Sequence, residues 1–302
     1  MNVTFECRAC SARAAALGAP WRCPCGGLWD VDPAAPVMLP DLGPVTLGEG
    51  DTPLMAVGPD QPGLWLKLEY VSPTSSFKAR GAVVLAAAAR AAGADLAVCD
   101  SSGNAGVAAA VYFARAGIPI EVFVPRSAAA AKLAAIAAHG ARVVTVDGSR
   151  AAVAVAAVQR VRATGAFYAS HVYNPLFYEG TKQFAVELAD RRVACVVVPF
   201  GNGSLVLGAS RGFGPDRPRL VGVRVEQRPT IAAGLAIDDP PRGPQAAAVL
   251  DEIVVVDDRQ ILAAQRRLDA MGIGAEPSGA VAYAGYLAAR ITGDTVVAIT
   301  GA

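Results

Sequence analysis

The chain has 302 residues, of which 53% are hydrophobic and 18% charged, and its formal net charge is +1. This composition supplies a sizeable core and argues against intrinsic disorder, and the small, dispersed charge argues against nucleic acid or an anionic membrane as a partner. Its apolar runs are broken before the ~20 residues of a membrane span, and its first residues lack the layout of a signal peptide, so we expect a cytoplasmic protein of one large or two ordinary domains.

The first feature along the chain is a group of four closely spaced cysteines. They are Cys7, Cys10, Cys23 and Cys25, in the pattern C-x2-C-x12-C-x-C. Two close pairs separated by a dozen residues are typical of two knuckles that close a tetrahedral metal site. Disulfides are the alternative, but they fit poorly with a chain that lacks a secretion signal. We therefore predict a structural zinc ion with four sulfur ligands in a short ribbon, residues 1–32.

After a proline-containing linker at 32–36, strand-like and helix-like segments alternate along the chain. The predicted strands are 64–69, 96–100, 120–124, 143–146, 167–169, 194–198, 220–225, 252–256 and 295–300, and the predicted helices are 82–92, one from the 101–106 loop to 116, 128–139, 151–163, 174–188, one from 204 to about 212, 257–271 and 278–290. The strands read as short, buried apolar runs. Such alternation predicts an α/β fold with right-handed crossovers and helices on both faces of a parallel sheet.

Lys78 lies where a Ser/Thr-rich loop, residues 72–77, leads into an alanine-rich predicted helix. A cation is poorly placed there, because the helix macrodipole puts partial positive charge at the N-terminus. The same field, together with partial burial, lowers the pKa of a lysine and supplies the free amine that a Schiff-base lysine needs. An ordinary surface lysine near a helix start is the alternative interpretation.

Three loops follow predicted strands at the edge where open α/β sheets bind ligands, beyond the carboxyl ends of the strands. They are Ser101–Gly106, Gly201–Ser204 and Thr300–Gly301. In the first two, small residues open a helix, so backbone N–H groups are exposed and the helix dipole favours an anion. Neither loop is a P-loop or a dinucleotide fingerprint, and each alone also fits a plain tight turn.

The segment from Ser72 to Gly81, S-P-T-S-S-F-K-A-R-G, resembles the lysine motif of threonine synthases, a branch of the fold-type II pyridoxal-phosphate enzymes that includes the tryptophan synthase β chain. The resemblance continues in order through 101–106, 169–171, 174–175, 179–182, 201–204, 276–278 and 300–301, and it includes the N-terminal cysteines. It implies an α/β fold-type II enzyme with two parallel or mixed-sheet domains flanked by helices, plus the zinc-ribbon-like segment. The implied large cofactor-binding domain is 33–83 with 173–302, and the small inserted domain is 84–172.

The resemblance also implies a role for each matching residue. Lys78 would be the Schiff-base lysine and proton shuttle, Phe77 would lie against the pyridine ring, and Thr300 would meet the ring nitrogen. The cofactor phosphate would bind Gly201, Asn202, Gly203 and Ser204. The substrate carboxylate would bind Ser101, Ser102, Gly103 and Asn104, and Asn104 would also hydrogen-bond the phenolic oxygen of pyridoxal phosphate. Lys182 would meet a substrate phosphate or form only a surface salt bridge.

The activity implied is that of a threonine synthase-like lyase, which eliminates phosphate from O-phosphohomoserine and adds water to give threonine. Three departures from the family motif lie close to the substrate: Ser72 replaces Asn, Ser75 replaces Gly and Ala79 replaces an acidic residue. They keep open a related β-elimination or β-replacement on serine, phosphoserine or another amino acid. A non-catalytic scaffold that holds a partner through its zinc ribbon is a third hypothesis. The family also implies a homodimer acting on a small amino-acid substrate.

Overall fold

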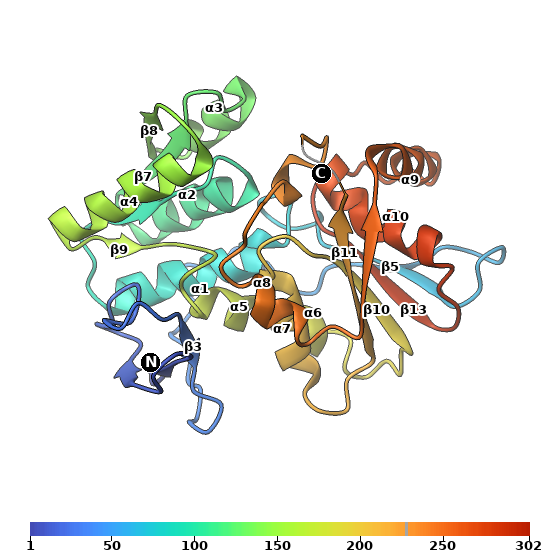
Figure 1. Cartoon of the computed structure of the whole chain (residues 1–302), viewed down its shortest axis with the longest axis horizontal. Helices are drawn as coiled ribbons and strands as arrows, with labels where there is room; N and C mark the ends of the chain where they lie inside the picture. Colours follow the sequence, from blue (N-terminus) through green and yellow to red (C-terminus); the bar gives the residue numbers. More distant parts are fainter. Residues whose placement is uncertain (227–228) are drawn as a thin grey trace. The chain divides into compact units, whose positions relative to one another are not determined.

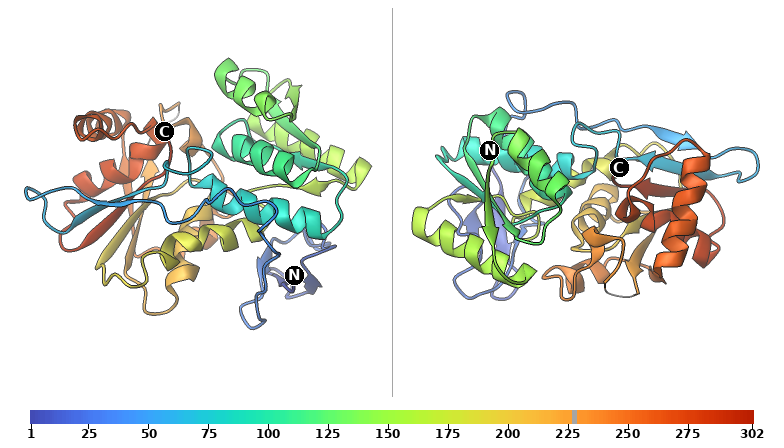
Figure 2. Two further views of the ribbon diagram at one scale, coloured as in Figure 1. Left: turned by 180° about the vertical axis from the view of Figure 1, so that it is seen from behind. Right: turned by 90° about the horizontal axis from the view of Figure 1, so that it is seen from above.

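The structure is a computed structural model that describes residues 1–226 and 229–302. The chain divides into two compact units: unit 1 comprises Met1–Leu47 and Lys78–Gly180, and unit 2 comprises Gly48–Phe77 and Thr181–Ala302. Each unit contains a largely parallel sheet flanked by helices, which confirms the predicted α/β class (Figures 1 and 2). The domain boundaries implied by the resemblance stay a prediction. Within the described residues, no helix is long and apolar enough to cross a membrane.

Unit 1 begins with a small antiparallel ribbon. Its strands are β1 (Thr4–Cys7), β2 (Arg13–Ala15) and β3 (Trp29–Val31), in the order β2-β1-β3. Phe5 and Trp29 belong to the same buried cluster as helices of the unit, so the ribbon is part of the unit 1 core. Tyr178 also donates its hydroxyl hydrogen to Asp30 Oδ1 at 2.8 Å, which ties the ribbon to a later segment of the unit.

The main sheet of unit 1 has four parallel strands in the order β8-β7-β6-β9. The strands are β6 (Ala97–Cys99), β7 (Ile120–Pro125), β8 (Arg142–Val146) and β9 (Phe167–Tyr168), and the helices are α1 (Lys78–Ala91), α2 (Asn104–Ala116), α3 (Ala130–Ala138), α4 (Arg150–Thr164) and α5 (Leu176–Thr181). Successive side chains of a strand point to opposite faces. Accordingly, Cys99 joins the cluster around α1 and α2, whereas Val98 joins the cluster around α4. The sheet is therefore covered on both faces.

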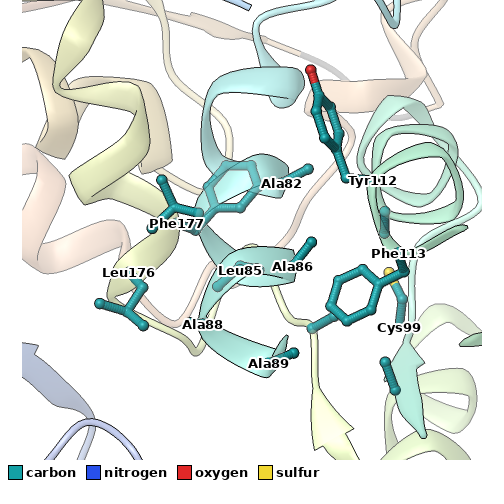
Figure 3. Packing of buried hydrophobic residues seen from close by; sticks show 14 of the residues in the cluster. Ala82, Leu85, Ala86, Ala88, Ala89, Cys99, Tyr112, Phe113, Leu176 and Phe177 are labelled. Carbon is teal, nitrogen blue, oxygen red and sulfur yellow. The ribbon is translucent and has the colours of Figure 1, made fainter. Parts of the chain in front are cut away.

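Helix α1 is alanine-rich because it is enclosed on two sides. Leu176 and Phe177 of α5 pack against one side of it, and Tyr112 and Phe113 of α2 lie on the other (Figure 3). At Gly81, an added Cβ would lie 2.6 Å from ring carbons of Phe177, so only glycine fits there. A helix that is hydrophobic all round is expected to be buried in this way. The packing fixes the position of the residue that begins α1, Lys78.

Unit 2 has six strands in the order β12-β11-β10-β13-β5-β4. The strands are β4 (Leu54–Ala56), β5 (Leu64–Leu68), β10 (Cys195–Pro199), β11 (Arg219–Val225), β12 (Glu252–Val256) and β13 (Thr295–Ile299), and the helices are α6 (Gln183–Val186), α7 (Ser204–Phe213), the 3-10 helix η1 (Ala233–Leu235), α8 (Gly243–Ala247), α9 (Asp258–Ala270) and α10 (Pro277–Ala289). β4 is antiparallel to β5, and the other pairs are parallel. Helices α9 and α10 share a buried cluster with side chains of the sheet, which places them over one of its faces.

Three details differ from the predicted elements. The predicted helix 174–188 consists of α5 and α6, separated at Lys182. Helix α8 lies between the predicted strands 220–225 and 252–256, where no helix was predicted; Pro244 occupies its first turn, where a missing N–H costs no hydrogen bond. The edge strand β4 was not predicted, since its three residues are too short for a periodicity signal.

Candidate active site

The loop that leads to Lys78 carries unsatisfied polar groups. Lys78 is the first residue of α1 and is half-buried. The hydroxyl oxygens of Ser72, Thr74 and Ser76 are buried and have no hydrogen-bond partner within residues 1–226 and 229–302. Buried hydroxyls are normally paired, so these groups leave polar capacity for a ligand beside the lysine segment.

The carboxyl end of β13 pairs with the same loop within unit 2. The backbone N–H of Phe77 donates to Thr300 O at 3.1 Å, and Ala302 N donates to Ser75 O at 3.2 Å. Ser76 and Gly301 form an isolated antiparallel bridge. The structure thus brings Phe77 and Thr300 together, although they are 223 positions apart in the chain. Thr300 is 5% exposed.

The loop Ser101–Gly103 joins β6 to α2 in unit 1. Gly103 is the N-cap of α2, and no side chain caps this helix, whose N-terminal partial positive charge favours an anion. A Cβ at Gly106 would lie 1.9 Å from Ser101 O, so glycine is required for the first turn of α2 to approach the loop. Asn104 is the first residue of α2 and is half-buried. This arrangement fits a carboxylate.

The loop Gly201–Gly203 joins β10 to α7 in unit 2. Like α2, helix α7 follows a glycine N-cap and has no side-chain cap. Gly203 has φ +86°, in the left-handed region that favours glycine, and no side chain caps α7. Ser204 O accepts a hydrogen bond from Thr181 Oγ1 at 2.9 Å, which fixes the start of the helix. Asn202 is half-buried beside these glycines. A helix N-terminus that no side chain caps fits the phosphate of a cofactor.

Two other residues singled out by the sequence have definite places. Lys182 lies between α5 and α6, and a Cβ at Gly212 would be 3.2 Å from Lys182 Cγ, so the Lys182 stem packs near the end of α7. His171 is buried and lies three residues after the end of β9 in the chain. Burial is the main cause that lowers its pKa well below 6.5, and the positive charges of Lys78 and Arg150 act in the same direction. His171 is therefore a neutral imidazole at physiological pH.

The sequence reasoning missed an ion pair beside the Ser101 loop. Arg150, the first residue of α4, donates from Nη2 to Asp100 Oδ2 at 3.0 Å. Asp100 is 3% exposed and stands immediately before Ser101. A carboxylate that ends an otherwise apolar buried strand is the signal that could have drawn attention to it. Its partner, 50 residues away, could not have been identified from spacing.

The four N-terminal cysteines meet in the ribbon of unit 1. Their sulfur atoms all lie within 4.8 Å of one another, with Cys7 Sγ 3.5 Å from Cys25 Sγ and Cys10 Sγ 3.7 Å from Cys23 Sγ. These distances are far longer than a disulfide bond. Four ligands at a Zn–S distance of ~2.3 Å in a tetrahedron are ~3.8 Å apart. The thiols therefore fit a four-sulfur metal site.

The fold and these sites define an enzyme of the pyridoxal-phosphate class. The model of the family described as pyridoxal-phosphate dependent enzyme matches residues 45–301, and the chain belongs to this family, as a fold-type II lyase of the threonine synthase-like group. The threonine synthase of Methanosarcina acetivorans is 31% identical, over 91% of this chain and 79% of the relative. The threonine synthase of Mycobacterium leprae is 32% identical, over 86% of this chain and 83% of the relative.

Solved structures share the fold at lower identity. Maize serine racemase superposes with a TM-score of 0.74 at 23% identity, covering 83% of this chain and 87% of the racemase. An O-ureido-L-serine synthase superposes with a TM-score of 0.74 at 23% identity, covering 88% and 92%. At this identity the likeness speaks for the fold alone, because one fold hosts many activities.

Proposed function

We propose that the protein is a threonine synthase-like lyase that converts O-phosphohomoserine and water into threonine and phosphate. Relatives that are 31–32% identical and carry that name support the proposal. The observation that carries it is the pair of uncapped helix N-termini, α2 after Ser101–Gly103 and α7 after Gly201–Gly203, in a chain whose α1 begins at Lys78. One suits a substrate carboxylate and the other a cofactor phosphate.

Three segments of unit 2 would hold the cofactor. The backbone N–H groups at Gly201–Ser204 would bind the phosphate of pyridoxal phosphate, Phe77 would lie against its ring, and Thr300 would offer a neutral hydroxyl to the ring nitrogen. When bound, pyridoxal phosphate supplies an electron sink for negative charge at the substrate α-carbon. A neutral partner at the ring nitrogen suits elimination and replacement better than transamination.

The substrate would be oriented by unit 1. The N–H groups at Ser101–Asn104 would hold its carboxylate, and Asn104 would also hydrogen-bond the phenolic oxygen of the cofactor. Lys78 Nζ would hold the cofactor covalently and, once released by the substrate amine, would take the α-proton. Lys182 would meet the leaving phosphate. In the overall reaction, phosphate would leave Cγ with the bonding electron pair, Cβ would lose a proton, Cγ would gain one to become the methyl group, and water would supply the hydroxyl at Cβ and a proton.

The first prediction concerns Lys78. Lys78→Ala should abolish the covalent link to pyridoxal phosphate and reduce turnover by several orders of magnitude, because both the link and the proton carrier are lost. Borohydride reduction followed by peptide mass mapping measures the link, and release of phosphate together with threonine from O-phosphohomoserine measures turnover. Lys132→Ala, on α3, is the matched control and should keep the cofactor. Wild-type turnover in Lys78→Ala would disprove the assignment.

A second candidate activity is β-elimination or β-replacement on serine or phosphoserine. It is favoured by Ser75, which puts a side chain, in left-handed backbone (φ +52°), where the family motif usually has glycine. Ser75 lies three residues before Lys78 in the chain, so this departure from the motif keeps a different substrate side chain open. A panel of O-phosphohomoserine, O-phosphoserine and serine distinguishes the two activities by their products: threonine with phosphate, or pyruvate with ammonia.

We further propose that Cys7, Cys10, Cys23 and Cys25 bind one structural zinc ion. The sulfur-to-sulfur distances of 3.5 and 3.7 Å support a tetrahedral site. Backbone N–H groups of Ala9 and Gly27 donate to Cys7 Sγ and Cys25 Sγ at 3.4 and 3.3 Å, as suits thiolate ligands. With four protein ligands there is no open position for a substrate, so the ion would be structural.

We also propose that the enzyme works in the cytoplasm as a homodimer. The resemblance to the family supports both statements. Multi-angle light scattering of the purified protein measures the oligomeric state, and a mass of one chain, 30.8 kDa, would disprove the dimer.

A further inference from the structure

An ion pair lies directly beside the loop that opens α2. Arg150 Nη2 donates to Asp100 Oδ2 at 3.0 Å. Asp100 follows β6, is 3% exposed and precedes Ser101 in the chain. Arg150 begins α4, and its side chain is 52% exposed. The guanidinium is thus anchored to the residue next to the proposed carboxylate-binding loop while remaining accessible.

Stability alone does not account for this pair. A cation in the first turn of a helix opposes the macrodipole, and α4 already has a cap, since Ser149 Oγ accepts from Ala152 N at 3.4 Å. Taking a carboxylate out of water is costly, and the attraction of one partner commonly does no more than offset that cost. A better account is that Asp100 holds Arg150 in one orientation.

Most of the hydrogen-bonding capacity of Arg150 is available. A guanidinium group has five N–H donors, and in the part of the chain that the structure describes Asp100 is the one hydrogen-bond and ion-pair partner of Arg150. Asp100 also acts on Tyr168: burial, and then the negative charge of Asp100, raises the pKa of Tyr168 above its ordinary value. The pair with Arg150 uses Asp100 Oδ2, whereas Asp100 Oδ1 and the Tyr168 hydroxyl are buried and have no hydrogen-bond partner in the described part of the chain.

Arg150 also acts on the same buried group as Lys78. The positive charges of both residues lower the pKa of His171, after burial. The geometric placement comes from the hydrogen bond to Asp100, the residue before Ser101. Through it, Arg150 puts a partly exposed cation beside the Ser101–Asn104 loop of unit 1.

We propose that Arg150 is a specificity residue, with Asp100 as its positioning residue, and that it binds an anionic oxygen group at the end of the substrate side chain. This inference rests on the proposed function and narrows its substrate class to amino acids whose side chain ends in a phosphate ester or a carboxylate. The planar fork of a guanidinium matches both groups with two parallel hydrogen bonds. A serine side chain would leave the available donors of Arg150 without a ligand.

The test measures ligand binding and turnover separately. Wild type, Arg150→Met, Arg150→Lys and Asp100→Asn are loaded with pyridoxal phosphate, and uptake is checked by the visible spectrum. Dissociation constants for O-phosphohomoserine, O-phosphoserine, aspartate and serine are then measured by calorimetry, with KM and kcat for every ligand that reacts. The matched control is Arg142→Met, which removes another exposed arginine paired with a buried carboxylate, Glu121, at 3.1 Å.

We expect Arg150→Met to raise the dissociation constant or KM of the anionic ligands about 10- to 100-fold and that of serine less than threefold. Asp100→Asn should give a smaller loss in the same direction, and Arg150→Lys should restore part of the binding. Preference for the phosphate esters over aspartate would identify phosphate as the ligand, and the reverse order a carboxylate. Equal effects on serine and on the anionic ligands, or equal effects of Arg150→Met and Arg142→Met, would overturn the inference. If the proposed function is wrong, the wild-type protein takes up no pyridoxal phosphate. In that case the dissociation constants of wild type and Arg150→Met for the anionic ligands and serine, measured without cofactor, still decide the role of Arg150.

Discussion

Ser75 adopts a backbone conformation that serine rarely adopts. Its φ is +52°, and its neighbours hold it there: its N–H donates to Ser72 O at 2.8 Å, and its carbonyl accepts from Ala302 N at 3.2 Å. Left-handed backbone costs a residue with a Cβ ~1–2 kcal/mol. Such strain persists where the surrounding structure imposes it, often near functional sites. Ser75 lies three residues before Lys78.

Ser75→Gly should therefore stabilise the protein. We expect a gain of about 1 kcal/mol, because relief of the left-handed strain exceeds the greater entropy of glycine in the unfolded chain. A calorimetric melting temperature should rise by about 2–4 °C. Ser72→Gly, in the same loop but outside the positive-φ region, is the control and should lower the melting temperature. A lower melting temperature for Ser75→Gly would contradict the strain argument.

His171 makes stability depend on pH. Burial, and then the charges of Lys78 and Arg150, holds its folded-state pKa well below 6.5. The unfolded chain, with an ordinary pKa of about 6.5, takes up the proton first as the pH falls. The contribution of His171 to stability is therefore complete above pH 6.5 and is lost as the pH falls below it, by at most ~1.4 kcal/mol per pH unit.

Denaturant unfolding between pH 5 and 8 measures this slope. His171→Gln should flatten the pH dependence below 6.5 whatever its effect on absolute stability. His139→Gln is the control, because His139 is the other of the two histidines and lies exposed at the C-terminal end of α3. Parallel pH curves for wild type and His171→Gln would show that His171 is not the titrating group.

At the scale of elements, the sequence pattern predicts a strand most clearly where it is a buried apolar run, as in β6, β10 and β13. The alanine-rich stretch after Lys78 is the helix α1, which Phe177 and Phe113 enclose (Figure 3). The hydrophobic pattern of a segment does not predict which other segments that element contacts. The pairing of Phe77 with Thr300 depends on strand order, in which β13 lies beside β5. Strand order is a property of the folded sheet and leaves no local signal.

Gly106 illustrates a requirement that arises between elements. An added Cβ would lie 1.9 Å from Ser101 O, so Gly106→Ala must push the first turn of α2 away from the loop that precedes it. We expect a loss of about 1–3 kcal/mol in the free energy of unfolding and weaker binding of the substrate carboxylate. Gly103→Ala is the control, because its Cβ would meet only Ser101 Oγ at 4.0 Å. Equal stability of the two variants, measured by chemical denaturation, would contradict this account of the loop.

At the scale of the whole molecule, the family resemblance assigns roles to residues of each unit. Unit 1 carries Lys78 and Ser101–Asn104, and unit 2 carries Phe77, Gly201–Ser204 and Thr300. The resemblance to the family predicts these residues because each of them lies within a short, continuous sequence motif. It does not predict the pair Asp100–Arg150, which is separated by 50 residues and belongs to no motif. Side chains that meet only through packing leave no pattern in a single sequence.

The cysteine ribbon connects a metal to the stability of unit 1. Phe5, Cys7 and Trp29 belong to the same buried cluster as α1 and α2, so loss of the metal should loosen the core on which Lys78 depends. Structural zinc contributes on the order of 10 kcal/mol of binding free energy in small sites. We therefore expect one zinc per chain by elemental analysis, and a melting temperature that falls by several degrees in excess chelator.

Cys10→Ser should lose the zinc and reproduce the effect of the chelator. Cys195→Ser is the matched control, since Cys195 is a free, buried thiol in β10 of unit 2 and lies outside the four-cysteine cluster. It should lower stability through its polar hydroxyl in an apolar strand and yet keep the full complement of zinc. Because the ribbon packs into the unit 1 core, the zinc-free protein should also bind substrate carboxylate more weakly. Wild-type protein without zinc would show that the four thiols meet for packing alone, and Cys10→Ser that retains the full zinc content would show that Cys10 is not a ligand.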